Sequence, residues 1–362
     1  MSGGPGAGTS ASGGYSEGVL RSFDSVLIVS FGGPQGPDDI RPFLANVLRG
    51  RRVSPERVEE VVRHYELFGG VSPITELTLR QAEGLKERLA AAGHPLPVHI
   101  GMRNWHPLLP DTLCHMADDG LRHAVGFIAA AQHSYSSCEQ YRQNVADARA
   151  TLRKAGVPDV DVTYVGSWFD HPLFVEANAR HVEQALGKLA ESHRAAARIV
   201  FTAHSIPVSM ADASQYRQQL DASARAVAER VGREWVLVYQ SRSGRPGDPW
   251  LEPDVSDYLR QARADGLEAA VLCPIGFVCD HIEVLYDLDH EAARAAADAG
   301  LAITRAAAVN DDALFLDMMA DVVLRTIKRY SGSPLPIASA APRPEGTRPL
   351  TRNAEEGGMR RL

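Results

Sequence analysis

The chain has 362 residues, of which 44% are hydrophobic, so it can bury the core of two ordinary domains or of one large α/β unit. Its formal net charge of −7 argues against nucleic acid as the main partner, because phosphate binding requires a basic surface. No apolar run approaches the length of about 18 residues that a membrane-spanning helix needs, so the sequence predicts no transmembrane segment.

The two ends of the chain differ in composition from the middle. Residues 1–22 are rich in Gly, Ser and Ala and lack the basic and apolar regions of a signal peptide, while Pro, Arg, Glu and Gly dominate residues 331–362. We expect both tails to be disordered. The four cysteines, at positions 114, 138, 273 and 279, form no C-x-x-C pair, which favours a cytoplasmic protein with reduced thiols.

Between the tails, strand-like apolar runs alternate with longer helical ones. The strand-like runs are 25–30, 98–102, 124–130, 160–165, 198–203, 235–239, 269–274 and 302–308. The helical runs include 73–91, 139–155, 172–189, 215–231, 281–299 and 311–329. Repeated strand–helix units predict an α/β fold with mainly parallel sheets flanked by helices. Counting the elements predicts two similar halves, 23–166 and 167–330, with the last helix packing back, although the sequence shows no repeat.

Several polar or glycine-rich segments of the first half lie at predicted element ends. The loop that begins at Phe31 does not fit G-x-G-x-x-G opening into a helix, so it is either a tight turn or a loop whose backbone approaches a flat ligand. Ser54 and Ser72 each precede a proline, a pattern typical of a helix N-cap. Ser72 can therefore cap a helix or offer its hydroxyl to a carboxylate. Ser134 and Tyr141 can bind an amphipathic ligand, or simply cap and pack another helix.

The second half carries potential metal ligands after two of its predicted strands. His204 follows the strand 198–203, and the helix after the strand 269–274 carries Glu283, Asp287 and Glu291. Spacings of four and eight place these acids on one face of an α-helix, over roughly 12 Å at about 1.5 Å per residue.

The positions of these ligands suggest a cation site. Ligands of open α/β proteins bind at the carboxyl ends of strands, and an imidazole opposite a carboxylate suits Fe²⁺, Zn²⁺ or Co²⁺. Two protein ligands with vacant positions are typical of a transient site. The alternatives are a structural histidine and a solvated helix face.

Five ordered motifs resemble the ferrochelatase family, and more closely the coproporphyrin-type ferrochelatases of Gram-positive and related bacteria. The motifs are Ser30-Phe-Gly-Gly-Pro34, Gly69-Gly-Val-Ser-Pro-Ile74, Ala203-His-Ser-Ile-Pro207, Asp248-Pro-Trp-Leu-Glu-Pro-Asp254 and Pro274-Ile-Gly-Phe-Val-Cys-Asp-His-Ile-Glu-Val-Leu-Tyr286. The resemblance runs from residue 24 to residue 328. It implies two Rossmann-like, chelatase-type halves with a porphyrin cleft between them.

The resemblance also implies an activity and a set of site residues. The activity is that of a lyase-class metal chelatase, which inserts Fe²⁺ into coproporphyrin III to give coproheme in haem biosynthesis. The implied residues are His204 and Glu283 for catalysis and the inner metal site, Asp287 and Glu291 for an outward metal path, and Ser72, Tyr141 and Phe31 for the porphyrin. Phe31 occupies a position where part of the family has a tyrosine that ligates the product iron. No cysteine follows Cys279, so we expect no [2Fe-2S] cluster and no cofactor beyond the substrate Fe²⁺.

Two other functions stay open from the sequence. The first is a ferrochelatase that uses protoporphyrin IX and makes protohaem, and the second is a non-catalytic haem or metal carrier. The four carboxylates of coproporphyrin favour a cleft rich in hydroxyls, arginines and helix N-termini, and Ser72, Ser134, Tyr141 and Arg49 agree with that substrate. Handover of the product to a downstream haem-pathway enzyme is a further expectation.

Overall fold

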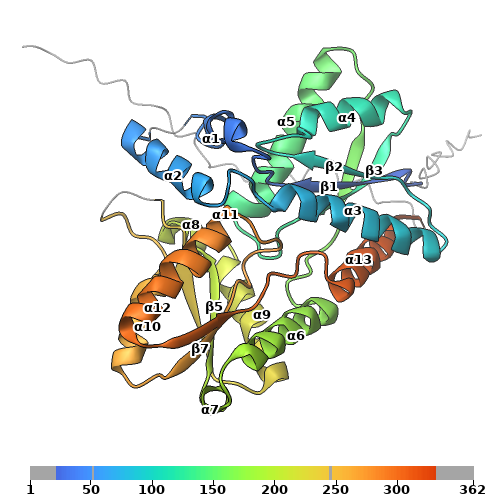
Figure 1. Cartoon of the computed structure of the whole chain (residues 1–362). Helices are drawn as coiled ribbons and strands as arrows, with labels where there is room; N and C mark the ends of the chain where they lie inside the picture. The colour runs from blue at the N-terminus through green and yellow to red at the C-terminus, as the bar shows by residue number, and fades with distance from the viewer. Residues whose placement is uncertain (1–21, 51–52, 244–246, 332–362) are drawn as a thin grey trace, which may run out of the picture.

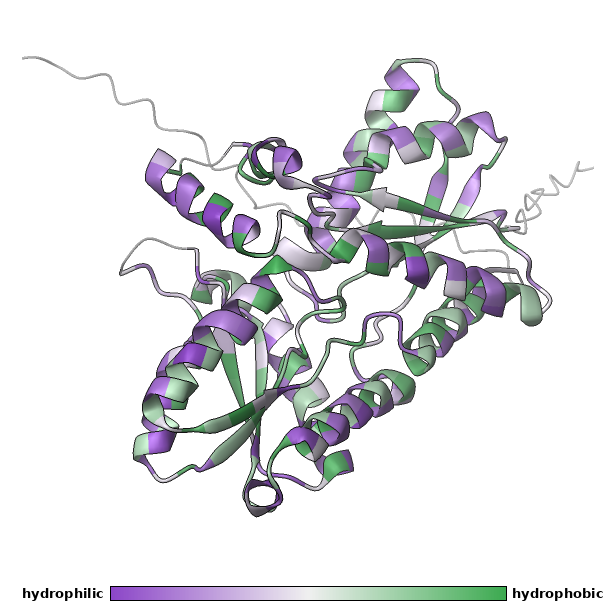
Figure 2. Ribbon diagram, viewed as in Figure 1, coloured by the Kyte–Doolittle hydropathy of each residue, from purple (hydrophilic) through white to green (hydrophobic). Residues whose placement is uncertain are grey.

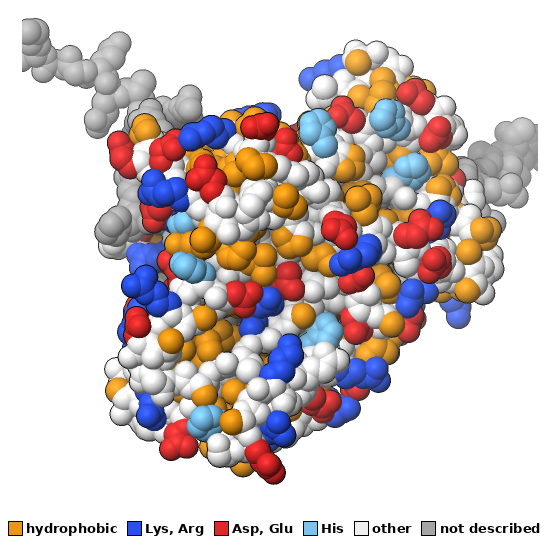
Figure 3. All heavy atoms as spheres, in the orientation of Figure 1, with side chains coloured by type: hydrophobic (Ala, Val, Ile, Leu, Met, Phe, Trp, Pro, Cys, Tyr) orange, Lys and Arg blue, Asp and Glu red, His pale blue; other side chains and the backbone are white. Residues whose placement is uncertain are grey.

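The computed structural model describes residues 22–50, 53–243 and 247–331. The predicted tails, 1–22 and 331–362, lie outside the described residues except for positions 22 and 331. No helix within the described ranges is long and apolar enough to cross a membrane. On the face drawn in Figure 3, acidic and basic side chains are interspersed and form no basic tract.

The described strands form two four-stranded sheets with the same strand order, β2-β1-β3-β4 and β6-β5-β7-β8. All pairings within both sheets are parallel. The strands are β1 (Ser25–Ser30), β2 (Val98–Met102), β3 (His123–Ile128), β4 (Asp161–Tyr164), β5 (Arg198–His204), β6 (Trp235–Gln240), β7 (Ala269–Cys273) and β8 (Ala302–Arg305). The predicted α/β fold of two parallel-sheet halves is therefore confirmed, and β1 and β3 are the counterparts of β5 and β7 (Figure 1).

The helices connect the strands and cover the faces of both sheets (Figure 1). The α-helices are α1 (Ile40–Val47), α2 (Pro55–Leu67), α3 (Ile74–Ala91), α4 (Leu109–Asp118), α5 (Gln140–Lys154), α6 (Pro172–Lys188), α7 (Glu191–Arg194), α8 (Val208–Asp212), α9 (Tyr216–Val231), α10 (Val255–Ala264), α11 (Ile282–Val284), α12 (Ala293–Ala299) and α13 (Ala313–Ser331). A 3₁₀ turn, η1 (Pro37–Asp39), and two π-helical turns, η2 (Tyr135–Glu139) and η3 (Leu285–Ala292), complete the described elements.

Alternating side chains of the central strands fill two different cores. In β1, Val26 and Ile28 contribute to one hydrophobic cluster, while Leu27 and Val29 contribute to another on the opposite face. Ile199 and Phe201 of β5 belong to the same cluster as Val26, so one core extends from sheet to sheet. Strands buried on both faces need continuous apolar sequence, and Figure 2 shows hydrophobic strands enclosed by helices with hydrophilic outer faces.

The last helix joins the two halves. α13 packs against α3 of the N-terminal half and α6 of the C-terminal half. Polar contacts on both sides fix it there: Arg88 Nε lies 2.5 Å from Asp317 Oδ1, and His171 Nε2 lies 2.8 Å from Asp321 Oδ2. The halves are therefore held together at the side where α13 lies.

The structure corrects two local predictions. Ser54 caps α2 as predicted, since its side chain accepts a hydrogen bond from the Arg57 amide, but the predicted Ser72 cap is wrong. α3 begins at Ile74 with Pro73 as its N-cap, and no side chain caps it. The Ser72 amide instead donates to the Pro34 carbonyl at 2.8 Å, which draws this segment onto the loop after β1.

The second correction concerns the helix that carries Glu283, Asp287 and Glu291, three residues that we call the acid column. The prediction treated 281–299 as one α-helix, but its middle is the π-helical turn η3. A π-helix closes i→i+5 hydrogen bonds, so the α-helical spacing assumed for the three acids does not apply. π-Helical turns occur frequently at functional sites.

Candidate functional site

The loop after β7 touches the end of β5 at Gly276. The Gly276 amide donates to the Thr202 carbonyl at 3.1 Å. A Cβ atom at Gly276 would lie 2.6 Å from the Cβ of Ala203 and 2.8 Å from its Cα, distances that no ordinary side chain tolerates. The glycine therefore permits an approach that brings the end of one strand beside the helix that follows the other.

This approach places His204 opposite Glu283. His204 Nε2 lies 3.9 Å from Glu283 Oε2, and the imidazole side chain is 34% exposed. Its other ring nitrogen, Nδ1, lies 2.5 Å from the Ser205 carbonyl oxygen. Because a carbonyl only accepts hydrogen bonds, Nδ1 carries a proton there, and Nε2 is the ring position that can present a lone pair. The Tyr216 hydroxyl donates to the His204 carbonyl at 3.0 Å and helps to fix the backbone.

Glu283 lies between two histidines. Besides His204, His281 Nε2 lies 3.5 Å from Oε2 of Glu283. Burial opposes ionisation of Glu283, but the hydrogen bond from His281 and the charges of the two imidazoles prevail, so the pKa of Glu283 falls to about 2. The site therefore holds a carboxylate at neutral pH, which can attract a cation but is a weak proton acceptor.

His281 is a site residue that the sequence predictions missed. Its side chain is 15% exposed, and its buried Nδ1 has no hydrogen-bond partner among the described residues. Its ring centroid lies 5.1 Å from that of Phe277. The available signal was the spacing, because His281 precedes Glu283 by two residues in a segment already singled out for its acids.

Asp287 lies one step further along the acid column. It accepts hydrogen bonds from the Ser241 hydroxyl and, at 3.1 Å, from Gln240 Nε2. Burial raises the pKa of Asp287 to about 7, the charge of Glu283 contributes to this rise, and the two hydrogen bonds oppose it. Ser241 adopts a left-handed backbone with φ of 59°, which turns the chain after β6 and brings its hydroxyl to Asp287. Neither partner was singled out in the sequence.

Glu291 is the outermost of the three acids. It is exposed, and it hydrogen-bonds Tyr286 within η3. Partial burial raises the pKa of Glu291 above its usual value. The acids thus run from the His204 contact toward solvent in the order Glu283, Asp287, Glu291.

The three residues predicted to contact a porphyrin lie near the carboxyl ends of the N-terminal strands. Phe31 follows β1 and packs edge-on against Phe43, with ring centroids 6.2 Å apart. Ser72 is buried, and a Cβ at Gly33 would meet its Cβ at 2.6 Å.

Tyr141, the third of these residues, lies in the first turn of α5, and the guanidinium carbon of Arg103 lies 6.0 Å from its ring centroid. Burial raises the pKa of Tyr141, and the negative charge of Glu283 adds to that rise. The Arg103 guanidinium opposes that rise.

Contacts between the halves surround the acid column. Ile282 packs into a cluster with aromatic and aliphatic residues of α1 and α2, including Phe43 and Tyr65. The rings of His64 and Tyr286 stack with centroids 3.5 Å apart. The α1–α2 segment of the N-terminal half thus covers the beginning of the helix that carries Glu283.

Comparisons with known proteins agree on one family. The family model described as Ferrochelatase matches residues 24–327. The coproporphyrin III ferrochelatase of Mycolicibacterium smegmatis is 46% identical over 306 residues, which cover 83% of this chain and 89% of that protein. The coproporphyrin III ferrochelatase of Streptomyces coelicolor is 46% identical over 318 residues, covering 83% and 85%. A ferrochelatase of Rhodopirellula baltica is 44% identical over 317 residues, covering 87% and 89%.

Solved structures add a likeness of fold. SirB from Bacillus subtilis with Fe³⁺ superimposes with a TM-score of 0.54 at 10% identity, over 86% of this chain and 98% of that one. The sirohydrochlorin chelatase SirB from Bacillus subtilis subspecies spizizenii in complex with cobalt gives a TM-score of 0.51 at 10% identity, with the same coverage. Identities this low show the shared fold alone.

Proposed function

The chain belongs to the ferrochelatase family, and we propose that it is a lyase-class metal chelatase that inserts Fe²⁺ into coproporphyrin III, giving coproheme in haem biosynthesis. The family match covers residues 24–327, and relatives that are 46% identical carry the name coproporphyrin III ferrochelatase. The observation that carries the proposal is the pair formed by His204 Nε2 and Glu283 Oε2, 3.9 Å apart. It sets a nitrogen lone pair beside a carboxylate at the end of a parallel strand, where this fold class binds ligands.

The proposed reaction needs a group that accepts protons and a group that receives the metal. A free porphyrin carries two pyrrole protons, and Fe²⁺ replaces both, so each turnover releases two protons from the ring. The Nε2 lone pair of His204 can take a pyrrole proton or ligate the incoming iron, since Nδ1 is already bonded to the Ser205 carbonyl. Glu283 stabilises either positive species, because its pKa of about 2 keeps it ionised.

We propose that Asp287 and Glu291 supply iron to this pair. The hydrogen bonds from Ser241 and Gln240 orient Asp287, and Glu291 is exposed at the outer end of η3. Carboxylate oxygens alone bind Fe²⁺ less tightly than a ligand set that includes an imidazole nitrogen. The affinity for Fe²⁺ therefore rises from Glu291 and Asp287 toward the His204 and Glu283 pair, which favours transfer of iron toward that pair. Oxygen ligands alone therefore suit transport better than retention.

The porphyrin is proposed to lie against Phe31, Ser72 and Tyr141. Phe31 offers an aromatic surface and has no atom that can ligate iron. Ser72 and Tyr141 are buried at 2% and 7% exposure, so a propionate meets their hydroxyls only after the covering segments move. The loop after β1, whose Gly33 and Pro34 lie against Ser72, is the segment whose movement we propose.

The substrate assay discriminates this function from its two alternatives. Purified full-length protein is mixed anaerobically with Fe²⁺ and either coproporphyrin III or protoporphyrin IX, and the loss of free-porphyrin fluorescence is followed. We expect multiple turnovers with coproporphyrin III and a lower kcat/KM with protoporphyrin IX. The reverse preference would assign the chain to protohaem synthesis, and stoichiometric retention of haem without turnover would make it a carrier.

Two further parts of the proposal concern cofactors and partners. We propose that the protein holds no [2Fe-2S] cluster, which predicts no acid-labile sulfide in the protein as purified. We also propose that coproheme passes to a downstream haem-pathway enzyme. Faster release of bound coproheme in the presence of that enzyme would support a direct transfer, whereas an unchanged release rate would contradict it.

A further inference from the structure

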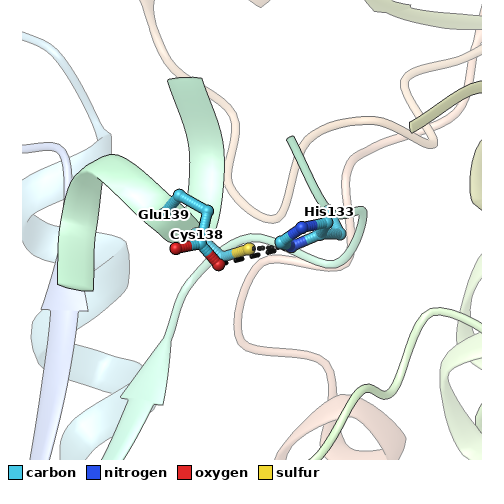
Figure 4. A group of neighbouring side chains, drawn as sticks. All are labelled: His133, Cys138 and Glu139. Carbon is cyan, nitrogen blue, oxygen red and sulfur yellow. Dashed lines mark hydrogen bonds and ion pairs between the residues drawn. The ribbon is translucent and has the colours of Figure 1, made fainter. Parts of the chain in front are cut away.

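A second group of metal-ligand side chains lies in the N-terminal half. His133, Cys138 and Glu139 each direct one ligand atom toward a common point, and these atoms lie within 4.8 Å of one another (Figure 4). His133 Nδ1 is 2.6 Å from Cys138 Sγ and 3.9 Å from Glu139 Oε1. None of the three residues takes part in the reaction proposed above.

The loop that carries this cluster is held at both ends. The His133 amide donates to Gln219 Oε1, on α9 of the C-terminal half, at 2.7 Å. Ser134 and Ser137 form a reciprocal capping box at the start of η2, and Ser137 Oγ also donates to the Gln132 carbonyl at 2.8 Å. The π-helical turn then returns Cys138 toward His133, so the backbone fixes the direction of both side chains.

The position of the cluster in the fold is a second, independent observation. It lies in the connection after β3, whose counterpart after β7 carries His281, Glu283 and Asp287. The connection after β7 contains the π-helical turn η3, whereas η2 is kinked at Ser137, whose backbone is not helical. The two loops also touch, because Gln132 Nε2 donates to the Ile275 carbonyl at 3.3 Å. Equivalent loops of the two halves therefore both carry potential metal ligands, and the two loops are in contact.

We propose that His133, Cys138 and Glu139 form a second cation site, distinct from the His204 and Glu283 pair, for a borderline divalent transition metal such as Zn²⁺. Imidazole, thiolate and carboxylate are the ligands Zn²⁺ uses in proteins. Three protein ligands leave one position of a tetrahedron for water, the arrangement of an open site.

The separations of the ligand atoms agree with such an ion. Ligands at about 2.0–2.3 Å from a tetrahedral Zn²⁺ stand about 3.3–3.8 Å apart, close to the separation of His133 Nδ1 and Glu139 Oε1. The shorter contact of Cys138 Sγ opens by about 1 Å to admit the metal. Binding replaces the thiol proton with the metal, so each ion bound at Cys138 releases one proton to solvent.

The site is reachable from solvent. The His133 and Glu139 side chains are 39% and 45% exposed, and Cys138 is partly exposed. Arg142 Nη1 lies 3.9 Å from Glu139 Oε1. Of the remaining cysteines, Cys114 is also partly exposed, whereas Cys273 and Cys279 are buried. Cys114 is therefore a matched control for any change at Cys138.

The test uses Co²⁺ as a spectroscopic probe in the full-length protein. A thiolate ligand gives Co²⁺ a near-ultraviolet charge-transfer band that nitrogen and oxygen ligands do not give. We expect this band at one equivalent in the wild type, in Cys114→Ser and in His204→Ala, and its loss in Cys138→Ser. A band that persists in Cys138→Ser, or that is absent from the wild type, would overturn the site.

A second measurement keeps the proposal testable if Cys138→Ser fails to fold. In Cys114→Ser the remaining accessible thiol is Cys138, and its rate of reaction with a disulfide reagent is measured with and without one equivalent of Zn²⁺. We expect Zn²⁺ to suppress this reaction, and His133→Gln to abolish the suppression. Equal rates with and without Zn²⁺ in Cys114→Ser would exclude cation binding at Cys138.

Discussion

The loops after β3 and β7 occupy equivalent positions in the two halves, but they assemble their ligands differently. After β7, Glu283 depends on His204 at the end of a neighbouring strand, so the pair joins residues 79 positions apart in the chain. After β3, the three potential ligands come from residues 133–139 alone. The strand beside that loop, β1, is followed by Phe31, which offers no ligand atom. A site assembled across strands requires the folded sheet, whereas a local one requires a single loop conformation.

The largest expected effect comes from replacing His204, the residue that the site after β7 takes from a neighbouring strand. His204→Ala should lower kcat for Fe²⁺ insertion by about 10²- to 10⁴-fold, the range lost with a general acid–base group. The matched control is His193→Ala, on α7 (Glu191–Arg194) of the same half, which should leave kcat unchanged. Anaerobic turnover is measured after circular dichroism has confirmed the fold, and near-normal turnover by His204→Ala would contradict the site assignment.

The next effect concerns the close approach that brings the strands together. Gly276→Ala would place its Cβ 2.6 Å from that of Ala203, and overpacking of this kind costs about 1–3 kcal/mol of unfolding free energy. Gly33→Ala meets Ser72 Cβ at the same distance in the other half. We expect similar losses in urea unfolding, but a higher KM for iron in Gly276→Ala and a higher KM for porphyrin in Gly33→Ala.

If the two glycine variants changed the same kinetic constant, the assignment of iron to one half and porphyrin to the other would be wrong. Unchanged midpoints in urea would show instead that the loops shift freely to admit a methyl group. Either result would show that Gly276 and Gly33 do not have equivalent roles in the two halves.

A smaller effect is expected from the pH dependence of Asp287. Its pKa is raised to about 7, so the residue is neutral below that pH and becomes a carboxylate above it. The KM for Fe²⁺ should therefore fall as pH rises through about 7 in the wild type. In Asp287→Asn, the KM for Fe²⁺ should stay high both below and above about pH 7. A wild-type KM for Fe²⁺ that rises with pH would contradict the prediction.

The smallest effect is expected at the outer end of the column. Glu291→Ala removes an exposed carboxylate, so we expect a KM for Fe²⁺ raised by less than in Asp287→Asn and no change in kcat. Glu229→Ala, on α9 (Tyr216–Val231), provides an acidic control outside the column. An iron dependence identical to that of Glu229→Ala would reject the supply role of Glu291.

Much of the fold was predictable because the local signals agreed with one another. The runs that became β1 and β5 have apolar centres, Val26–Val29 and Ile199–Phe201, that are fully buried, a pattern that propensity and burial favour together. The repeated strand order was not predictable, because it is a property of pairing between distant segments and left no repeat in the sequence.

The predictions at single residues failed where long-range contacts decided the outcome. Ser54 and Ser72 precede prolines alike, yet only Ser54 caps a helix, because the Ser72 amide is bound by Pro34. Asp287 could be named from its spacing, but Ser241 could not, since only the left-handed turn after β6 brings it there. The π-helical turns also escaped prediction, because the sequence shows no change of period at Leu285.

The central claim is that His204 and Glu283, although brought together from separate strands, act as one unit. A double-mutant cycle of His204→Ala and Glu283→Gln on kcat for coproporphyrin III metallation tests this most directly. Groups that act together are strongly non-additive, so the double variant should be no slower than the slower single variant, within about threefold. Losses that multiply in the double variant would show independent roles and contradict the account.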